Sequence, residues 1–146
     1  MRRRLLALGL VFIAAHALAD ERADHVVAEP QAYPAVPLLS TGTSIIGETI
    51  RYPTTGPAQV TAAIVTLAPG EKTSVHKHGV PLFAYILEGE LTLDYAGYDK
   101  RTYRAGDTFM EAMGVAHLGI NTGAQTMRLL AVYMGAQDAE NVIPVK

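Results

Sequence analysis

The chain has 146 residues, 18% of them charged and 49% hydrophobic, which predicts a single folded domain and excludes a disordered chain. The formal net charge is −2, and the acidic excess grows when the N-terminal leader described below is removed, so nucleic acid and anionic membranes are disfavoured as partners. The absence of cysteine excludes disulfides, thiolate metal ligands and a cysteine nucleophile.

The first 19 residues have the pattern of a secretory leader. Three arginines at 2–4 precede an apolar run at 5–15, and residues 17–19 read Ala-Leu-Ala, a small-x-small cleavage site. An uncleaved anchor is the alternative, but the run is shorter than the roughly 20 residues that a membrane span needs. Cleavage leaves nine basic and fourteen acidic residues, a formal net charge of −5. We therefore expect a periplasmic protein, with secretion as the alternative and no membrane association after cleavage.

Residues 20–37 predict an extended arm that leads into a domain at 38–146. The arm is polar, carries three prolines and shows no sustained hydrophobic period. His25 lies in the arm and His16 in the leader, so neither is a candidate metal ligand.

From residue 38 onward the chain consists of short apolar or β-branched runs that are separated by Gly and Pro turns. Strands are predicted at 44–52, 59–67, 73–78, 82–88, 90–95, 101–104, 108–111, 117–121 and 125–134. Turn signals recur about every 7 to 12 residues, and no long segment has a helical period. This spacing predicts an all-β domain, either a sandwich or a barrel.

Three histidines stand out within residues 69–121. His76 and His78 are two residues apart on a predicted strand, so both imidazoles face the same side, and His117 follows about forty residues later. Neutral imidazoles suit Fe, Ni, Cu and Zn, and three of them leave coordination positions open for a ligand. The pattern predicts a divalent-metal site. The alternative is a metal-free barrel with hydrogen-bonded core histidines.

Glycines frame these histidines in two patterns, Gly70-x5-His76-x-His78-x10-Gly89 and Gly106-x5-Ala112-x-Gly114-x2-His117-x3-Asn121. The patterns resemble the two motifs of the cupin family, G-x5-H-x-H-x3,4-E-x6-G and G-x5-P-x-G-x2-H-x3-N. The resemblance covers about residues 59–135. It implies a small single-domain, cupin-2-like protein with a double-stranded β-helix, or jelly-roll barrel, and a metal bound by the three histidines.

The chain departs from the family motifs at two positions. Counted back from Gly89, the metal-binding Glu of the family falls on Leu82, which cannot coordinate a metal, and the Pro of the second motif is Ala112. Glu111 lies six residues before His117 and is our candidate catalytic residue. It is expected to act as a base, a substitute fourth ligand or an acceptor that orients a histidine, with a solvated strand-end acid as the alternative.

The function that this resemblance implies is that of a metal-dependent small-molecule enzyme. Some cupin-like dioxygenases use three histidines and no carboxylate with iron, so we expect a dioxygenase with Fe(II) favoured and Mn, Ni, Cu or Zn as alternatives. A non-catalytic periplasmic module that binds or senses a metal or small ligand is the second hypothesis. A lyase or isomerase of sugar-like acids ranks third, because Lys77 should point away and only Arg51 or Arg128 remain to hold a carboxylate.

Strand alternation also predicts which residues line the pocket and which face outward. We expect an apolar pocket wall formed by Leu82, Ala84, Ile86, Phe109 and Met113. The alternative for each of these residues is ordinary core packing. Phe83, Tyr85 and Leu87 have the opposite phase and form an apolar outer face. From this face and the need to cover sheet edges we expect a homodimer.

Overall fold

The computed structural model describes residues 34–146, and Val36–Lys146 form one compact unit. The predicted leader at 1–19 and most of the predicted arm at 20–37, with His25, lie outside the described residues. Within the described part of the chain, no helix has the length and hydropathy that crossing a membrane requires.

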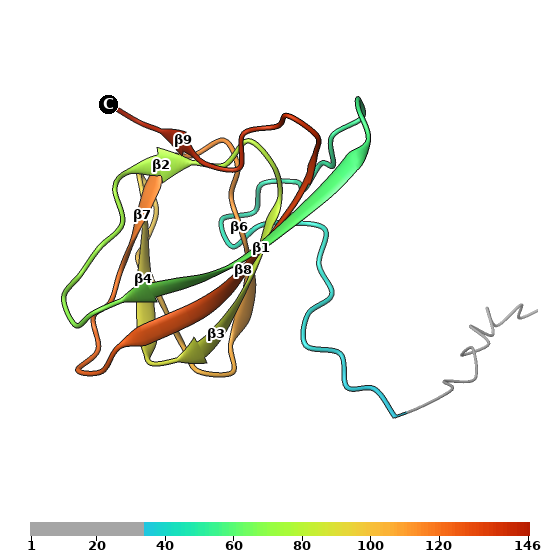
Figure 1. Ribbon diagram of the computed structural model, residues 1–146. Coiled ribbons are helices and arrows are strands. Elements are labelled where there is room, and N and C mark those ends of the chain that lie inside the picture. The colour runs from blue at the N-terminus through green and yellow to red at the C-terminus, as the bar shows by residue number, and fades with distance from the viewer. Residues whose placement is uncertain (1–33) are drawn as a thin grey trace, which may run out of the picture. The chain divides into compact units, whose positions relative to one another are not determined.

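The unit is built from strands in two antiparallel sheets (Figure 1). The strands are β1 (Ala58–Leu67), β2 (His76–Lys77), β3 (Leu82–Glu88), β4 (Glu90–Tyr95), β5 (Arg101–Arg104), β6 (Thr108–Glu111), β7 (His117–Ile120), β8 (Met127–Ala136) and β9 (Ile143–Pro144). One sheet has the order β1-β8-β3-β6 and the other the order β5-β4-β7-β2-β9. The sequence prediction of an all-β jelly-roll barrel is therefore confirmed.

The core lies between the two sheets because inward residues alternate with outward ones along each strand. In β3, Leu82, Ala84 and Ile86 are buried, whereas the intervening Phe83 and Tyr85 are half-buried on the outer face. This alternation agrees with the predicted strand phase. Leu91 and Leu93 of β4 supply part of the opposite wall of the core.

Two motif residues fix turns that the barrel needs. Gly89 separates β3 from β4 at a φ of 73°, and a β-carbon there would meet the Thr126 carbonyl oxygen at 2.7 Å. The buried Asn121 side chain donates to the carbonyl oxygens of Leu67 and Gln125, at 2.9 and 2.8 Å. These contacts join the end of β1 to the turn before β8, so Asn121 acts on the fold and not on the metal cluster.

Three details of the predicted strands are wrong. Residues 44–52 form no regular strand, because Gly47 adopts a φ of 85° and reverses the chain between the bridged residues Thr43 and Thr49. The strand predicted at 73–78 is reduced to His76–Lys77. The structure adds β9, which contains Pro144 and pairs at the sheet edge, where the missing N–H of proline is tolerated.

Candidate metal centre

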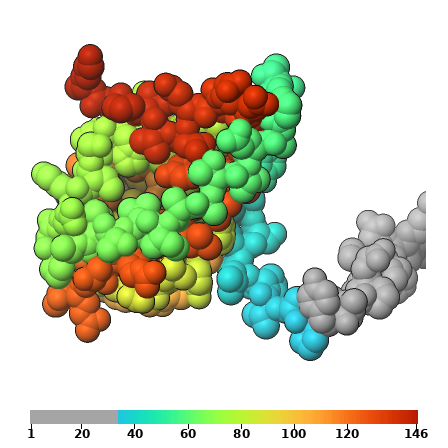
Figure 2. All heavy atoms as spheres, viewed as in Figure 1, coloured from blue at the N-terminus to red at the C-terminus, as the bar shows by residue number. Residues whose placement is uncertain are grey.

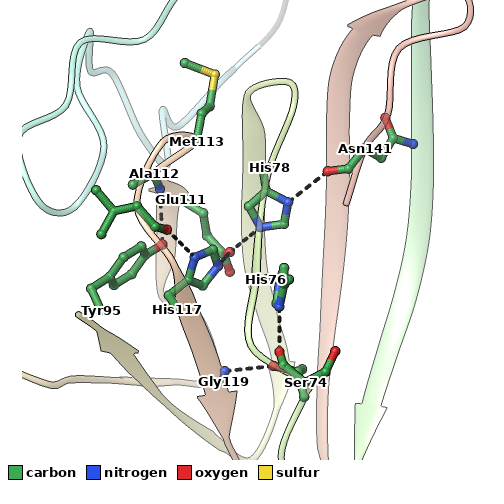
Figure 3. Close-up of polar contacts among 12 residues, drawn as sticks. Ser74, His76, His78, Tyr95, Glu111, Ala112, Met113, His117, Gly119 and Asn141 are labelled. Atoms are coloured by element: carbon green, nitrogen blue, oxygen red, sulfur yellow. Dashed lines mark hydrogen bonds and ion pairs between the residues drawn. The ribbon is translucent and has the colours of Figure 1, made fainter. Parts of the chain in front are cut away.

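Four side chains converge inside the barrel and could together hold a metal ion (Figure 3). His76 comes from β2, His78 from the residues that follow it, Glu111 from the end of β6 and His117 from the start of β7. One ligand atom from each residue lies within 4.8 Å of the ligand atoms of the others. The structure thus brings together the three predicted histidines and Glu111.

Backbone carbonyl groups set the orientation of all three imidazole rings. The Nδ1 atoms of His76, His78 and His117 lie 2.8, 3.0 and 3.1 Å from the carbonyl oxygens of Ser74, Asn141 and Val115. A carbonyl oxygen only accepts hydrogen bonds, so each Nδ1 carries a proton. In a neutral imidazole with that tautomer, Nε2 presents a lone pair. This is the state in which histidine binds a metal, and such a carbonyl partner is common beside metal sites.

The carboxylate of Glu111 is buried between two of these rings. Its Oε2 lies 2.7 Å from Nε2 of His78 and 2.7 Å from Nε2 of His117. Burial acts to raise the pKa of Glu111, but in the metal-free protein hydrogen bonds from Nε2–H of His117 and His78, which a ring offers only when it holds a second proton, outweigh burial and lower the pKa to about 2. Burial acts to lower the pKa of His117, but the contact with Glu111 outweighs burial and raises this pKa. The pKa of His76 is lowered by burial.

The donor set fits a divalent metal. In the neutral rings of His78 and His117 the proton is on Nδ1, so the lone pair of each Nε2 faces the Glu111 carboxylate oxygen at 2.7 Å. These lone pairs repel each other unless a cation lies between them. Donors about 2.1 Å from one ion lie at most about 4.2 Å apart, so the cluster fits after shifts of a few tenths of an ångström. Three neutral imidazoles and one carboxylate with a divalent ion carry a net charge of +1.

Glu111 enters the cluster from the strand next to the position at which the first motif would place its acid. Leu82 on β3 pairs with Glu111 on β6, and on its other side Leu82 pairs with Tyr133 on β8. Residues directly opposite each other in adjacent strands project from the same face of a sheet. Tyr133, Leu82 and Glu111 therefore form one cross-strand row on the inner face of the sheet.

The loop after Glu111 is held by hydrogen bonds from its backbone. The Ala112 N–H donates to the buried hydroxyl of Tyr95 at 3.1 Å, and the Met113 and Gly114 N–H groups donate to the Glu48 carboxylate at 2.5 and 2.9 Å. The Tyr95 ring also stacks on His117, with centroids 4.3 Å apart. Proline at position 112 would lack the N–H that Tyr95 accepts, which gives the departure from the second motif a physical role.

The cluster opens into an apolar cavity of about 200 Å³. Its wall is formed by residues of β1, β3, β4 and β8, among them Val65, Leu67, Leu82, Leu91, Met127 and Leu129. The C-terminal segment contributes Val142. Figure 2 shows the face on which β1, in green, and the C-terminal segment, in red, lie at the surface, with a hollow between them.

The predicted pocket wall is only partly correct. Leu82 lines the cavity, but Ala84, Ile86 and Phe109 belong to the core, and Met113 is half-buried outside the cavity. The cavity instead follows β1 and β8, and Ala131 and Leu129, which pair with Ala84 and Ile86, line it in their place. Among residues 34–146, no Lys or Arg lines the cavity, and Arg128 is paired with Glu88 at 3.0 Å.

Sequence reasoning missed several residues that shape the site. Glu48 lies in a segment predicted as a strand, and Asn141 acts through its carbonyl oxygen, so neither had a recognisable signal. Tyr133 could have been found, because alternation along the predicted strand at 125–134 puts it in phase with the inward Leu129 and Ala131.

Comparison with known proteins agrees with the fold and the motif spacing. The family model described as "Cupin domain" matches residues 63–133, a range that contains the whole cluster and both motif cores. The chain belongs to the cupin family. No curated protein matches it.

Solved structures with the same fold include enzymes of different activities. A mutant of oxalate decarboxylase OxdC from Bacillus subtilis is 21% identical with a TM-score of 0.52, over 59% of this chain and 24% of that chain. The oxalate decarboxylase of Lactobacillus farciminis, in a formate complex, has the same identity and TM-score, over 59% of this chain and 26% of that chain. The polyketide cyclase RemF from Streptomyces resistomycificus is 21% identical with a TM-score of 0.52, over 67% of this chain and 68% of that chain. The match thus spans about a quarter of the oxalate decarboxylase chains, and identities this low establish the fold alone.

Proposed function

We propose that the protein is a metal-dependent enzyme of the dioxygenase type that acts on a small molecule. The metal would be held by His76, His78 and His117, with Glu111 as a fourth ligand. The observation that carries the proposal is that three Nε2 atoms and one carboxylate oxygen converge while each Nδ1 is tied to a backbone carbonyl.

The residues of the chain would hold and isolate the reacting groups. The three carbonyl partners keep every imidazole in the metal-binding tautomer, and the Tyr95 ring fixes the plane of His117. These four residues would hold the metal and would leave part of its coordination shell free for a small molecule. When bound, a redox-active metal would supply the oxygen chemistry. The apolar wall around Leu82 and Leu91 excludes water from the reacting atoms.

Iron(II) is the favoured metal, with Mn, Ni, Cu or Zn as alternatives. Imidazole nitrogens with one carboxylate suit all of these ions, because neither donor type is soft. A solved structure of Bacillus subtilis oxalate decarboxylase, described as having Mn(II) centres, is similar at 22% identity and a TM-score of 0.50. This similarity favours manganese among the alternatives.

Reconstitution of the purified chain tests the proposal. Protein stripped with a chelator is loaded separately with each metal, and its metal content is measured before oxygen uptake is followed with a set of diketones and catechols. We expect one ion per chain and oxygen uptake with at least one metal. A His117→Ala variant should retain no metal. Stoichiometric metal without oxygen uptake in any combination would reject the dioxygenase reaction.

A non-catalytic module that binds a metal or a small ligand is the second candidate. One observation favours it: Glu111 is engaged by both His78 and His117, so it is not free to act as a general base. The catalytic role of Glu111 stays a prediction, and these contacts support the ligand role that we weighed beside it. Tight binding of a compound that the loaded protein leaves unchanged, as measured by mass spectrometry, would support this candidate over the enzyme.

We also propose export and dimer formation. The leader pattern at 1–19 supports a periplasmic location, which the mature N-terminus at Asp20 would establish by mass spectrometry after cell fractionation. The partly exposed outer residues Phe83, Tyr85 and Leu87, and the uncharged edge strand β1, support a homodimer. A monomeric mass in solution at micromolar concentration would reject the dimer.

A further inference from the structure

The polar groups that line the cavity are few. Outside the His/Glu cluster they are the hydroxyls of Thr73, Ser74 and Tyr133, and within residues 34–146 no cationic side chain is among them. Thr73 Oγ1 is already engaged, because it accepts a hydrogen bond from the Gly119 N–H at 3.0 Å. With a divalent ion, the cluster offers one net positive charge, and the apolar wall offers nothing to balance a second negative charge on a ligand.

Tyr133 is placed to meet a ligand that binds at the cluster. It stands on the inner face of β8 directly opposite Leu82, in the row that ends at Glu111. Its ring centroid is 5.8 Å from that of His78. The described residues provide no hydrogen-bond partner for its hydroxyl, although the ring lines the cavity. Leu82 lies between Tyr133 and Glu111 in this row and separates the hydroxyl from the carboxylate.

We infer that the cavity takes a small neutral or singly ionised oxygen compound, such as an enolisable ketone or a phenol, and that Tyr133 donates a hydrogen bond to its oxygen. The inference rests on the proposed function, because it requires a metal at the cluster. A doubly ionised carboxylic acid is rejected, since its second charge would be buried without a partner. The volume of about 200 Å³ lies below the roughly 300–1,000 Å³ of pockets for drug-sized ligands, so the compound is small.

Acetylacetone and malonate are a matched pair of probes for this selectivity. Both have two oxygen-bearing carbons on either side of one carbon, but acetylacetone is neutral or singly ionised, whereas malonate carries two charges. The protein is loaded with Zn²⁺, which has no redox chemistry and so permits binding without turnover. Calorimetry then gives both affinities, and metal content is measured before and after titration.

We expect acetylacetone to bind at least tenfold more tightly than malonate. Tyr133→Phe should weaken acetylacetone binding about tenfold, which corresponds to about 1.4 kcal/mol, the upper part of the range for one hydrogen bond, and should leave zinc content unchanged. Tyr85→Phe is the control, because it removes a hydroxyl from the outer face of the same sheet.

The outcomes separate this inference from the proposed function. Zinc binding with equal affinities for the two probes, or with acetylacetone affinity unchanged in Tyr133→Phe, would overturn the inference and leave the metal centre intact. A chain that retains no zinc would overturn both. The expected selectivity, combined with no oxygen uptake by any of the metal-loaded forms, would support the inference and reject the dioxygenase.

Discussion

Leu82 and Glu111 lie directly opposite each other on the paired strands β3 and β6, and both side chains face the cavity. By its spacing from Gly89, Leu82 stands where the first cupin motif has an acid. Glu111 brings a carboxylate to the same part of the barrel from the neighbouring strand. The cluster therefore has one acid, and exchanging the two residues should move that acid across the strand pair.

The exchange predicts a rescue of metal binding. Glu111→Leu should lower metal affinity by about 100-fold or more, because a ligand is lost rather than an orienting partner. The double variant Leu82→Glu with Glu111→Leu should recover most of that loss, since opposite β-carbons lie about 5 Å apart. Competition with a chromophoric chelator measures both. If the double variant bound metal no better than Glu111→Leu, the position of the carboxylate on β6 would be essential.

Tyr95 and Ala112 should be energetically coupled. Ala112→Pro removes the N–H that donates to the Tyr95 hydroxyl, and Tyr95→Phe leaves that N–H buried without a partner, so each should cost about 1–3 kcal/mol of unfolding free energy. Urea denaturation of the wild type, the two single variants and the double variant gives a double-mutant cycle, which measures the coupling free energy between the two residues. We expect the double variant to lose less than the sum of the two single losses. Additive losses would mean that the hydrogen bond contributes little.

Glu48 should affect metal binding although it is not a ligand. Its carboxylate accepts from the Met113 and Gly114 N–H groups in the loop between Glu111 and His117. Glu48→Ala should lower metal affinity about tenfold, as is usual for groups that orient ligands. Asp107→Ala is the matched control, because Asp107 accepts from the Arg104 N–H in a turn between β5 and β6. Equal loss of affinity in both variants would indicate a general effect on stability.

The metal-free protein should lose stability in acid through Glu111. Its pKa of about 2 in the folded chain is below the usual 4.5, so the unfolded chain takes up a proton more readily. The stabilisation is complete above about pH 4.5 and is lost as the pH falls toward 2, by at most about 3 kcal/mol. Urea unfolding between pH 3 and 6, with a chelator present, should show a steeper loss than in Glu111→Gln. Parallel curves would contradict the prediction.

Most of the barrel could be predicted from local patterns, because turn residues and alternation act over a few positions. The strands from β3 to β7 lie within a residue or so of their predicted bounds. The segment at 44–52 could not be predicted, because its turn depends on the left-handed Gly47 and on bonds between Ser44 and Glu48. β9 could not be predicted either, because two residues carry no period.

The histidines of the candidate site followed from spacing, whereas the position of Glu111 depends on strand register. Spacing along one strand places His76 and His78 on one face without any knowledge of neighbouring strands. Glu111 reaches the cluster only because β6 pairs with β3 so that Glu111 faces Leu82. That register is set by packing between distant segments, so sequence alone left the role of Glu111 open.

The C-terminal segment should control access to the metal and the orientation of His78. The Asn141 carbonyl accepts from His78 Nδ1, β9 pairs with β2, and Val142 lines the cavity. Deletion of residues 140–146 therefore removes the partner that fixes the His78 tautomer and opens one wall. We expect metal affinity to fall about 10- to 100-fold and metal release to a chelator to accelerate. Val142→Ala, which keeps the backbone contacts, should leave metal affinity unchanged; if it matched the deletion, the side-chain wall rather than the carbonyl would hold the metal.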